Sequence, residues 1–333
     1  KYHKSSAMKL NILSILIISL FLSSCGKDET QGDDTPVVET STEISFLSNS
    51  KIILPTKQES TTLMATSDVY SKKLSPFDIK AKTQNASSTS ESQYLQYASL
   101  QARSWTATEI DAIKVTIASA KAKIEALGLN LELPAEIKLV KSSMEEEGGA
   151  SGYTRSNYIV LKSPPTESLF LHELFHIYSR MNTTKRDQLY ATINFEKCNS
   201  ITLPTAIRDG EITNPDAPFY EHFLTVEING EQKDVMFIIY SENPYTGGSF
   251  FSYLSQKLMV VEGDANNKTP VLINGSPVLK DFSEASNLKA LIGNNTNYTL
   301  HPEEVLADHF SLLILQTNVP DQSFLDDLEL ILK

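Results

Sequence analysis

Residues 166–181 read TESLFLHELFHIYSRM, and within them His172 and His176 stand four positions apart with Glu173 between them. Most of the other positions are apolar, so the stretch predicts a largely buried helix. Positions i and i+4 share one face of a helix, so the two imidazoles can converge on one metal ion. Glu173 lies about 100° around the helix from His172. It can therefore reach a metal-bound water and take its proton.

A five-residue motif also arises by chance, so the prediction of a metal site depends on a third ligand. Residues 302–316, PEEVLADHFSLLILQ, have apolar residues at helical spacing and carry Glu304. Three other donors compete with it: His301 at the helix entrance, Glu303 about 100° away on the helix, and His222 near a predicted hairpin. We rank Glu304 first, followed by His301, Glu303 and His222.

The later helix also carries Asp308, four residues after Glu304 in the pattern ExxAD. HExxH followed by such a helix resembles the gluzincin class of zinc metallopeptidases, the thermolysin type. The resemblance implies one zinc ion on His172, His176 and Glu304. It also implies that Asp308 accepts a hydrogen bond from the first motif histidine and fixes its ring, as carboxylates behind ligating imidazoles do.

Longer phrases extend the resemblance to a family of uncharacterised bacterial zinc-metallopeptidase-like proteins. They are YTRSNYIVL, LHELFHIYSR, ITNPDAP and YTLHPEEVLADHF, within residues 150–316. The metzincin extension is excluded, because Ser179 and Asn182 stand where it needs glycine and histidine. The stretch between His176 and Glu304 is far longer than in thermolysin-like enzymes.

Substrate contacts can be assigned from the same region. His301 and Tyr298 are predicted catalytic residues that donate a hydrogen bond to the developing oxyanion. Residues 153–161 predict one strand. The resemblance implies an edge strand above the motif helix that pairs with an extended substrate, so Tyr153 and Arg155 are predicted to bind substrate. An interior strand is the alternative.

The first residues are typical of a secretory signal sequence. Residues 8–25, MKLNILSILIISLFLSSC, have a basic start, an apolar run and then small residues that end at Cys25. This resembles a bacterial lipoprotein signal and implies cleavage before Cys25 and lipid attachment there. An ordinary signal peptide or an uncut anchor is the alternative. The expected location is the cell envelope, facing the periplasm or the cell surface.

Composition excludes several classes of protein. The chain has 333 residues, a net charge of −12 and two cysteines. A strongly acidic chain lacks the basic face of a nucleic-acid binder. Two cysteines cannot build a four-cysteine zinc site, and Cys198 has no local histidine to activate it as a nucleophile.

The chain is predicted to be α+β, with a zincin-like domain. Its predicted parts are a signal peptide at 1–24 (residues 1–7 being stray), a lipidated tether at 25–45, a loosely structured extension at 46–100, and a zincin-like domain at 101–333 with an inserted hairpin region at about 197–297. The expected elements are strands at 52–54, 137–140 and 153–161, helices at about 108–127, 166–181, 186–195 and 302–316, and hairpins at 221–240 and 271–278. Residues 250–261 fit a helix or a strand equally.

The function predicted from these features is a membrane-anchored zinc metallopeptidase, with a peptide or protein as substrate and Glu173 as general base. The oligomeric state stays open. One alternative is a catalytically silent surface lipoprotein that binds a peptide, protein or glycan. A purely structural zinc site is a further alternative, although such sites are usually closed by four protein ligands and rich in cysteine.

Overall fold

A computed structural model describes residues 39–47 and 50–333, and Glu39–Lys333 form one compact unit. The predicted signal peptide, the lipidation of Cys25 and most of the predicted tether lie outside the described residues. The described chain is a mixture of helices and strands, which confirms the predicted α+β class. None of its helices combines the length and apolar character needed to cross a bilayer.

The first sheet has a mixed topology. Its strand order is β1-β2-β4-β6-β5, and β3 also pairs with β4. The pairs β2–β4 and β4–β6 are parallel, and the others are antiparallel. The strands are β1 (Thr42–Ser45), β2 (Lys51–Leu54), β3 (Ala102–Arg103), β4 (Glu136–Ser142), β5 (Gly152–Arg155) and β6 (Tyr158–Leu161).

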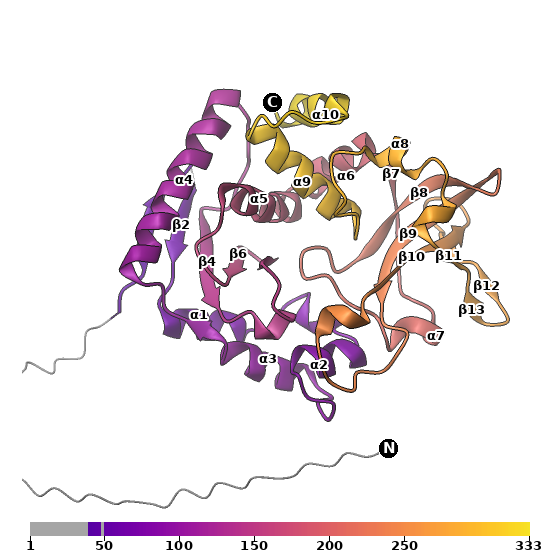
Figure 1. The fold of residues 1–333 in the computed structure, drawn as a ribbon, viewed down its shortest axis with the longest axis horizontal. Helices are drawn as coiled ribbons and strands as arrows, with labels where there is room; N and C mark the ends of the chain where they lie inside the picture. Colours follow the sequence, from indigo (N-terminus) through magenta and orange to yellow (C-terminus); the bar gives the residue numbers. More distant parts are fainter. Residues whose placement is uncertain (1–38, 48–49) are drawn as a thin grey trace, which may run out of the picture. The chain divides into compact units, whose positions relative to one another are not determined.

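Helices cover both faces of this sheet. Successive strand side chains alternate between faces, so Leu139 and Ile159 enter the main core with α4 (Ala107–Leu127) and α5 (Glu167–Met181). Val140 and Val160 point the other way, into a second core. That core lies under α1 (Lys57–Met64) and α3 (Glu91–Ser99), which Figure 1 shows on the opposite side of the sheet from α5.

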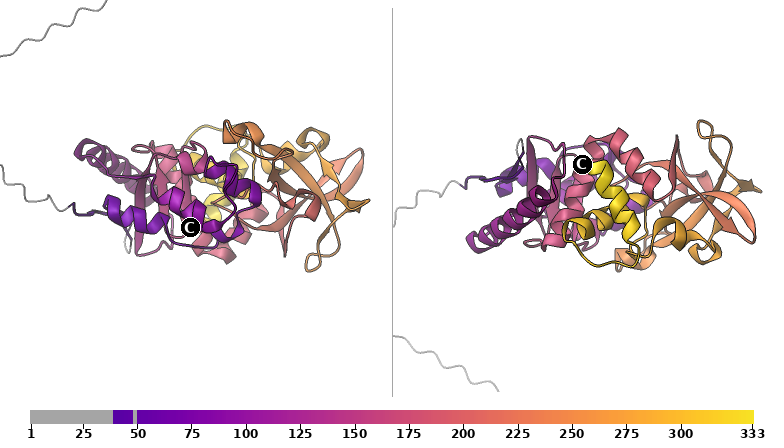
Figure 2. Two further views of the ribbon diagram at one scale, coloured as in Figure 1. Left: turned by 90° about the horizontal axis from the view of Figure 1, so that it is seen from below. Right: turned by 90° about the horizontal axis from the view of Figure 1, so that it is seen from above.

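The second sheet is antiparallel, with strand order β11-β10-β9-β8-β7, and β14 also pairs with β10. The two sheets lie at opposite ends of the described unit, with α5 and α9 between them (Figures 1 and 2). The strands are β7 (Phe195–Ile201), β8 (Tyr220–Ile228), β9 (Glu231–Tyr240), β10 (Ser255–Glu262), β11 (Thr269–Pro270) and β14 (Leu279–Lys280), and the separate hairpin is β12 (Leu272–Ile273) with β13 (Ser276–Pro277).

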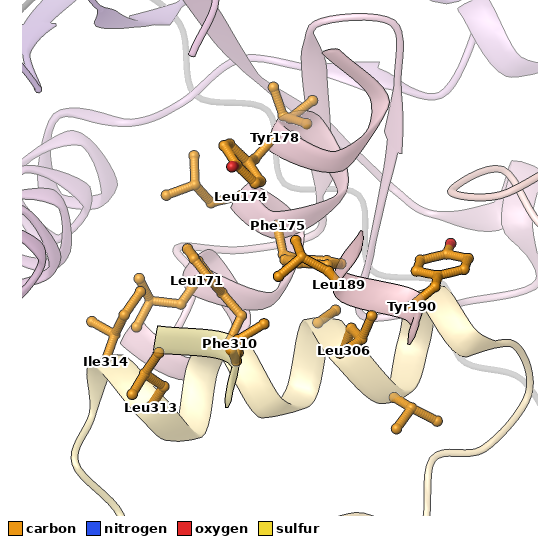
Figure 3. Packing of buried hydrophobic residues seen from close by; sticks show 14 of the residues in the cluster. Leu171, Leu174, Phe175, Tyr178, Leu189, Tyr190, Leu306, Phe310, Leu313 and Ile314 are labelled. Carbon is orange, nitrogen blue, oxygen red and sulfur yellow. The ribbon is translucent and has the colours of Figure 1, made fainter. Parts of the chain in front are cut away.

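The interface between α5, α6 (Thr183–Thr192) and α9 (Pro302–Ile314) lies in the main core. Leu171, Phe175, Leu306 and Phe310 interdigitate there with none of their surface exposed (Figure 3). This packing fixes the two helices that carry the predicted ligands. The remaining helices are α2 (Pro76–Lys82), α7 (Thr205–Arg208), α8 (Leu288–Ile292) and α10 (Gln322–Leu332).

Several local predictions agree with the structure. The helix expected at about 108–127 is α4, and Gly128 ends it in the left-handed region with φ 67°, as is typical of a helix-terminating glycine. Asn229 and Gly230 both have positive φ and form the two-residue turn between β8 and β9. Residues 250–261, left undecided, form a short 3₁₀ turn followed by β10.

Three predictions need correction. Residues 46–100 are not a loose extension, because β2 lies inside the first sheet, α1 and α3 cover that sheet, and α2 packs in a further buried cluster. Residues 153–161 are not one strand, because Ser156 takes φ 48° and turns the chain into the antiparallel pair β5–β6. The region predicted as an inserted hairpin, about 197–297, contains nearly all of a six-stranded sheet that begins at Phe195, ends at Lys280 and contributes to the main core.

Candidate metal centre

Helices α5 and α9 bring the three predicted ligands together. One ligand atom from each of His172, His176 and Glu304 lies within 4.8 Å of the others. Glu304 Oε2 is 3.1 Å from His172 Nε2 and 3.5 Å from His176 Nε2. His176 and Glu304 are buried, and His172 is only partly exposed. The arrangement is therefore a small polar group enclosed between two packed helices.

His172 is held from behind by Asp308. Its Nδ1 lies 2.9 Å from Asp308 Oδ1, as the resemblance implied. Thr296 donates a hydrogen bond to the other oxygen of Asp308. A donor hydrogen on Nδ1 leaves the Nε2 lone pair directed toward Glu304, which is the tautomer that a metal requires.

His176, like His172, has a carboxylate behind its ring. That carboxylate belongs to Glu303, which the sequence analysis ranked as a possible metal ligand. Glu303, considered as a competing ligand, instead has Oε1 at 3.0 Å from His176 Nδ1. Ser179 donates to the same oxygen, and the Tyr190 hydroxyl donates to Oε2 at 2.5 Å. Glu303 is 1 % exposed, so these three donors replace the water that its carboxylate would otherwise bind.

Glu304 is oriented by a residue that sequence reasoning did not assign. Asn214 Nδ2 donates to Glu304 Oε1 at 2.6 Å, which leaves Oε2 facing the two imidazoles. Asn214 belongs to the phrase ITNPDAP, which was noticed only as part of a resemblance. Asn214 and Glu304 are 90 residues apart in the sequence, so no local pattern predicts their contact.

Glu173 lies close to the edge strand of the first sheet. A Cβ placed on Gly152 would lie 2.5 Å from Glu173 Oε1, so any larger residue there would push the Glu173 carboxylate out of its present position. Glu173 is 3 % exposed, and its Oε2 has no hydrogen-bond partner in the described structure. Burial, and then the nearby Asp216 carboxylate, raise the pKa of Glu173 to about 8. A poised carboxyl of this kind is typical of a proton-transferring group.

Asp216 is a second residue that sequence reasoning missed. Its carboxylate, with Glu173 and His176, forms another group of potential metal ligands within 4.8 Å. Asp216 Oδ1 accepts hydrogen bonds from Thr154 N at 2.7 Å and from Thr154 Oγ1 at 2.6 Å. Only the cluster of turn-forming residues around it (Asn214-Pro215-Asp216) could have drawn attention to this segment.

The two predicted oxyanion donors have different surroundings. The Tyr298 ring lies 6.0 Å from the His172 ring and is 46 % exposed. Partial desolvation of the phenol and then the nearby carboxylates, Glu304 foremost, raise the pKa of Tyr298, so the phenol keeps its proton. His301 instead caps α9, because its Nδ1 accepts a hydrogen bond from Glu303 N at 3.1 Å. It is 7 % exposed at the start of that helix.

The predicted substrate contacts of Tyr153 and Arg155 also need correction, because both residues are 1 % exposed. Tyr153 donates to Glu146 at 3.1 Å, and Arg155 pairs with Asp68 at 2.8 Å. They anchor β5 to the elements beneath the sheet. His222, the last-ranked ligand candidate, lies 3.0 Å from Asp187 and outside the group of three.

The charges at the centre suit a bound cation. Burial lowers the pKa of His172, but its bonds to Asp308 and Glu304 outweigh burial and raise that pKa to about 10. Burial disfavours the charged form of Glu304, but the two imidazoles hold its pKa well below the usual range. His176 Nε2 is buried with no hydrogen-bond partner. A divalent cation would give that nitrogen a partner and replace the protons that the carboxylates attract.

Comparison of the chain with family models, with curated proteins and with solved structures found no match. The site is therefore interpreted from its own residues and their geometry.

Proposed function

We propose that this protein is a zinc-dependent metallopeptidase held at a membrane by lipid on Cys25. His172, His176 and Glu304 would hold the metal, and the fold would be of the zincin type. The observation that carries the proposal is the convergence of these three ligand atoms, with a carboxylate behind each imidazole. Carboxylate–imidazole–metal chains of this kind are the usual support of histidine ligands.

The distances from Glu304 to the two imidazoles are compatible with one shared zinc ion. Ligand atoms about 2.0–2.1 Å from a tetrahedral zinc lie roughly 3.3 Å from one another. The two distances from Glu304 Oε2 to the imidazoles are 3.1 and 3.5 Å. A zinc ion held by three protein ligands would keep room for a water, as in catalytic sites and unlike closed structural sites.

The chain's own residues would divide the chemistry of peptide hydrolysis among them. Zinc bound there would supply Lewis-acid activation of the water and of the scissile carbonyl. Glu173 would take the proton of the attacking water and deliver it to the leaving amine. The Tyr298 hydroxyl would donate to the oxyanion. Asn214, Glu303 and Asp308 would keep the ligands in position.

The test is zinc content by mass spectrometry on the purified protein. We expect about one zinc per chain in the wild type and a large loss in Glu304→Ala. Glu329→Ala, which removes a carboxylate paired with Lys333 outside the site, should keep the metal. Glu173→Gln should also keep the metal but lose about 10²–10⁴-fold in peptide hydrolysis. A wild-type chain that takes up no zinc on reconstitution would overturn the proposal.

A further inference from the structure

Asp216 is fixed beside the candidate metal centre with half of its carboxylate uncommitted. Oδ1 accepts from the main chain and the side chain of Thr154. Asn214 Oδ1 accepts from Asp216 N at 2.9 Å, and Arg180 donates to Asp216 O at 3.2 Å. No donor within the described ranges contacts Oδ2. These bonds make Asp216 a rigid wall of the site and leave one oxygen free to bind a ligand.

The same residue limits how far an extended peptide can pair with β5, the edge strand. Thr154 N points away from β6, because it donates to Asp216. By strand alternation the main-chain groups of Gly152 also point outward. Gly152 lies against the side chain of Glu173. The amide of Thr154, in contrast, already donates its hydrogen bond to Asp216. A peptide that pairs along β5 would therefore reach Gly152 and end at Asp216.

The net charge of the site determines whether the N-terminus or the C-terminus of a peptide can bind beside Asp216. Asp216, Glu303, Glu304 and Asp308 bring four carboxylates to this region. A divalent ion and Arg180 supply fewer positive charges than these groups supply negative ones. An uncommitted carboxylate in such a place repels a peptide's C-terminal carboxylate and attracts its ammonium group.

We propose that Asp216 binds the free α-amino group of the substrate, so that the enzyme removes residues from the N-terminus of peptides. This inference rests on the proposed peptidase function and specifies its substrate class. Asp216 is then a specificity-determining residue, and Asn214, Thr154 and Arg180 position it. A lysine side chain carries the same ammonium chemistry, and the experiment separates the two sources.

The first experiment compares a peptide with a free N-terminus and its N-acetylated form in the full-length protein. The free peptide should be cleaved with a kcat/KM about 10–100-fold higher, since a hydrogen bond between charged groups contributes about 1.5–3 kcal/mol. Asp216→Asn keeps the acceptor for Thr154 and should remove most of this preference by raising KM for the free peptide alone. An acetylated peptide with an internal lysine should gain nothing from Asp216.

Asp111→Asn is the matched control. It makes the same substitution at a carboxylate on α4 whose side chain is 76 % exposed. It should leave the cleavage of both peptides unchanged. If Asp216→Asn slows both equally, Asp216 has only a structural role and the inference is wrong. Preference for the lysine peptide would assign the ammonium to a side chain and would likewise overturn it.

Binding provides a second measurement that does not need turnover. Calorimetry with the Glu173→Gln protein should show that leucyl-glycine binds about 10-fold or more tightly than N-acetyl-leucyl-glycine. Adding Asp216→Asn should abolish the difference. Equal binding of the two dipeptides overturns the inference even if zinc uptake and hydrolysis support the peptidase. Loss of zinc uptake in the wild type would instead count against the proposed function.

Discussion

At the scale of single residues, the candidate centre is defined by what lies behind each ligand. Asp308 and Glu303 each contact the Nδ1 of one motif histidine, and Asn214 takes one oxygen of Glu304. These contacts leave Nε2 of His172, Nε2 of His176 and Oε2 of Glu304 facing one another. The sequence identified Asp308 by resemblance, but placed Glu303 among competing ligands.

Glu303→Gln tests the positioning of His176. The substitution keeps the shape of the side chain but weakens the bond that holds the imidazole in the metal-binding tautomer. We expect zinc affinity to fall about 10–100-fold, measured by competition with a chelator. Asp308→Asn should have an effect of similar size through His172. Glu145→Gln, at an exposed position, should have none. Unchanged affinity in Glu303→Gln would remove Glu303 from the centre.

Glu146 gives a prediction about pH and stability. It is fully buried, and burial raises its pKa from 4.5 to about 7. Between these values the folded chain holds a proton that the unfolded chain has lost, so the free energy of unfolding falls as pH rises from about 4.5 to 7. Glu146→Gln should remove this fall and gain on the order of 1–3 kcal/mol relative to wild type between pH 5 and 8.

Denaturant unfolding at several pH values measures this difference. Glu145→Gln is the matched control, because Glu145 is the exposed neighbour of the buried Glu146. Its stability relative to wild type should not change over the same range. A relative stability of Glu146→Gln that is independent of pH would contradict the assignment.

At the scale of elements, the geometry of the centre depends on how α5 and α9 pack. The Phe310 ring lies 5.5 Å from that of Phe175, and both side chains are completely buried (Figure 3). The ligands project from the same two helices. A shift of α9 by even a fraction of a turn would separate Glu304 from the imidazoles.

Phe310→Ala should therefore reduce both stability and metal binding. A cavity of this kind costs about 3–5 kcal/mol, and relaxation of α9 into it should lower zinc affinity. Thermal unfolding and chelator competition measure the two effects. Leu330→Ala removes a side chain that is 77 % exposed and should change stability by no more than about 0.5 kcal/mol. Full zinc affinity in a destabilised Phe310→Ala would show that the centre does not depend on this packing.

At the scale of the whole described unit, residues 39–100 are part of the fold. β2 lies between β1 and β4 in the first sheet, and Asp68 neutralises the buried Arg155. Without these residues, β4 would expose a new edge and Arg155 would be a buried charge without its partner. Such a charge is strongly destabilising.

A chain that begins at Glu39 should unfold in one cooperative transition, whereas a chain that begins at Gln101 should lack such a transition. Circular dichroism during heating separates the two outcomes. A folded chain from Gln101 onward would restore the predicted boundary between an extension and a domain.

The sequence by itself determined the local features whose cause is local. Gly128 ends α4, Asn229-Gly230 sets the β8–β9 turn, and the spacing of His172 and His176 fixes two imidazoles on one helical face. Helical periodicity and turn chemistry act over a few residues, so they can be read from a short window. The α+β class followed from the order of such windows.

Only the tertiary structure decided which distant residues complete the site. Asn214 and Asp216 reach Glu304 and Thr154 across 90 and 62 residues, and no short-range pattern encodes such contacts. The same holds for the burial of Tyr153 and Arg155. Each depends on packing between elements far apart in the chain, which periodicity does not specify.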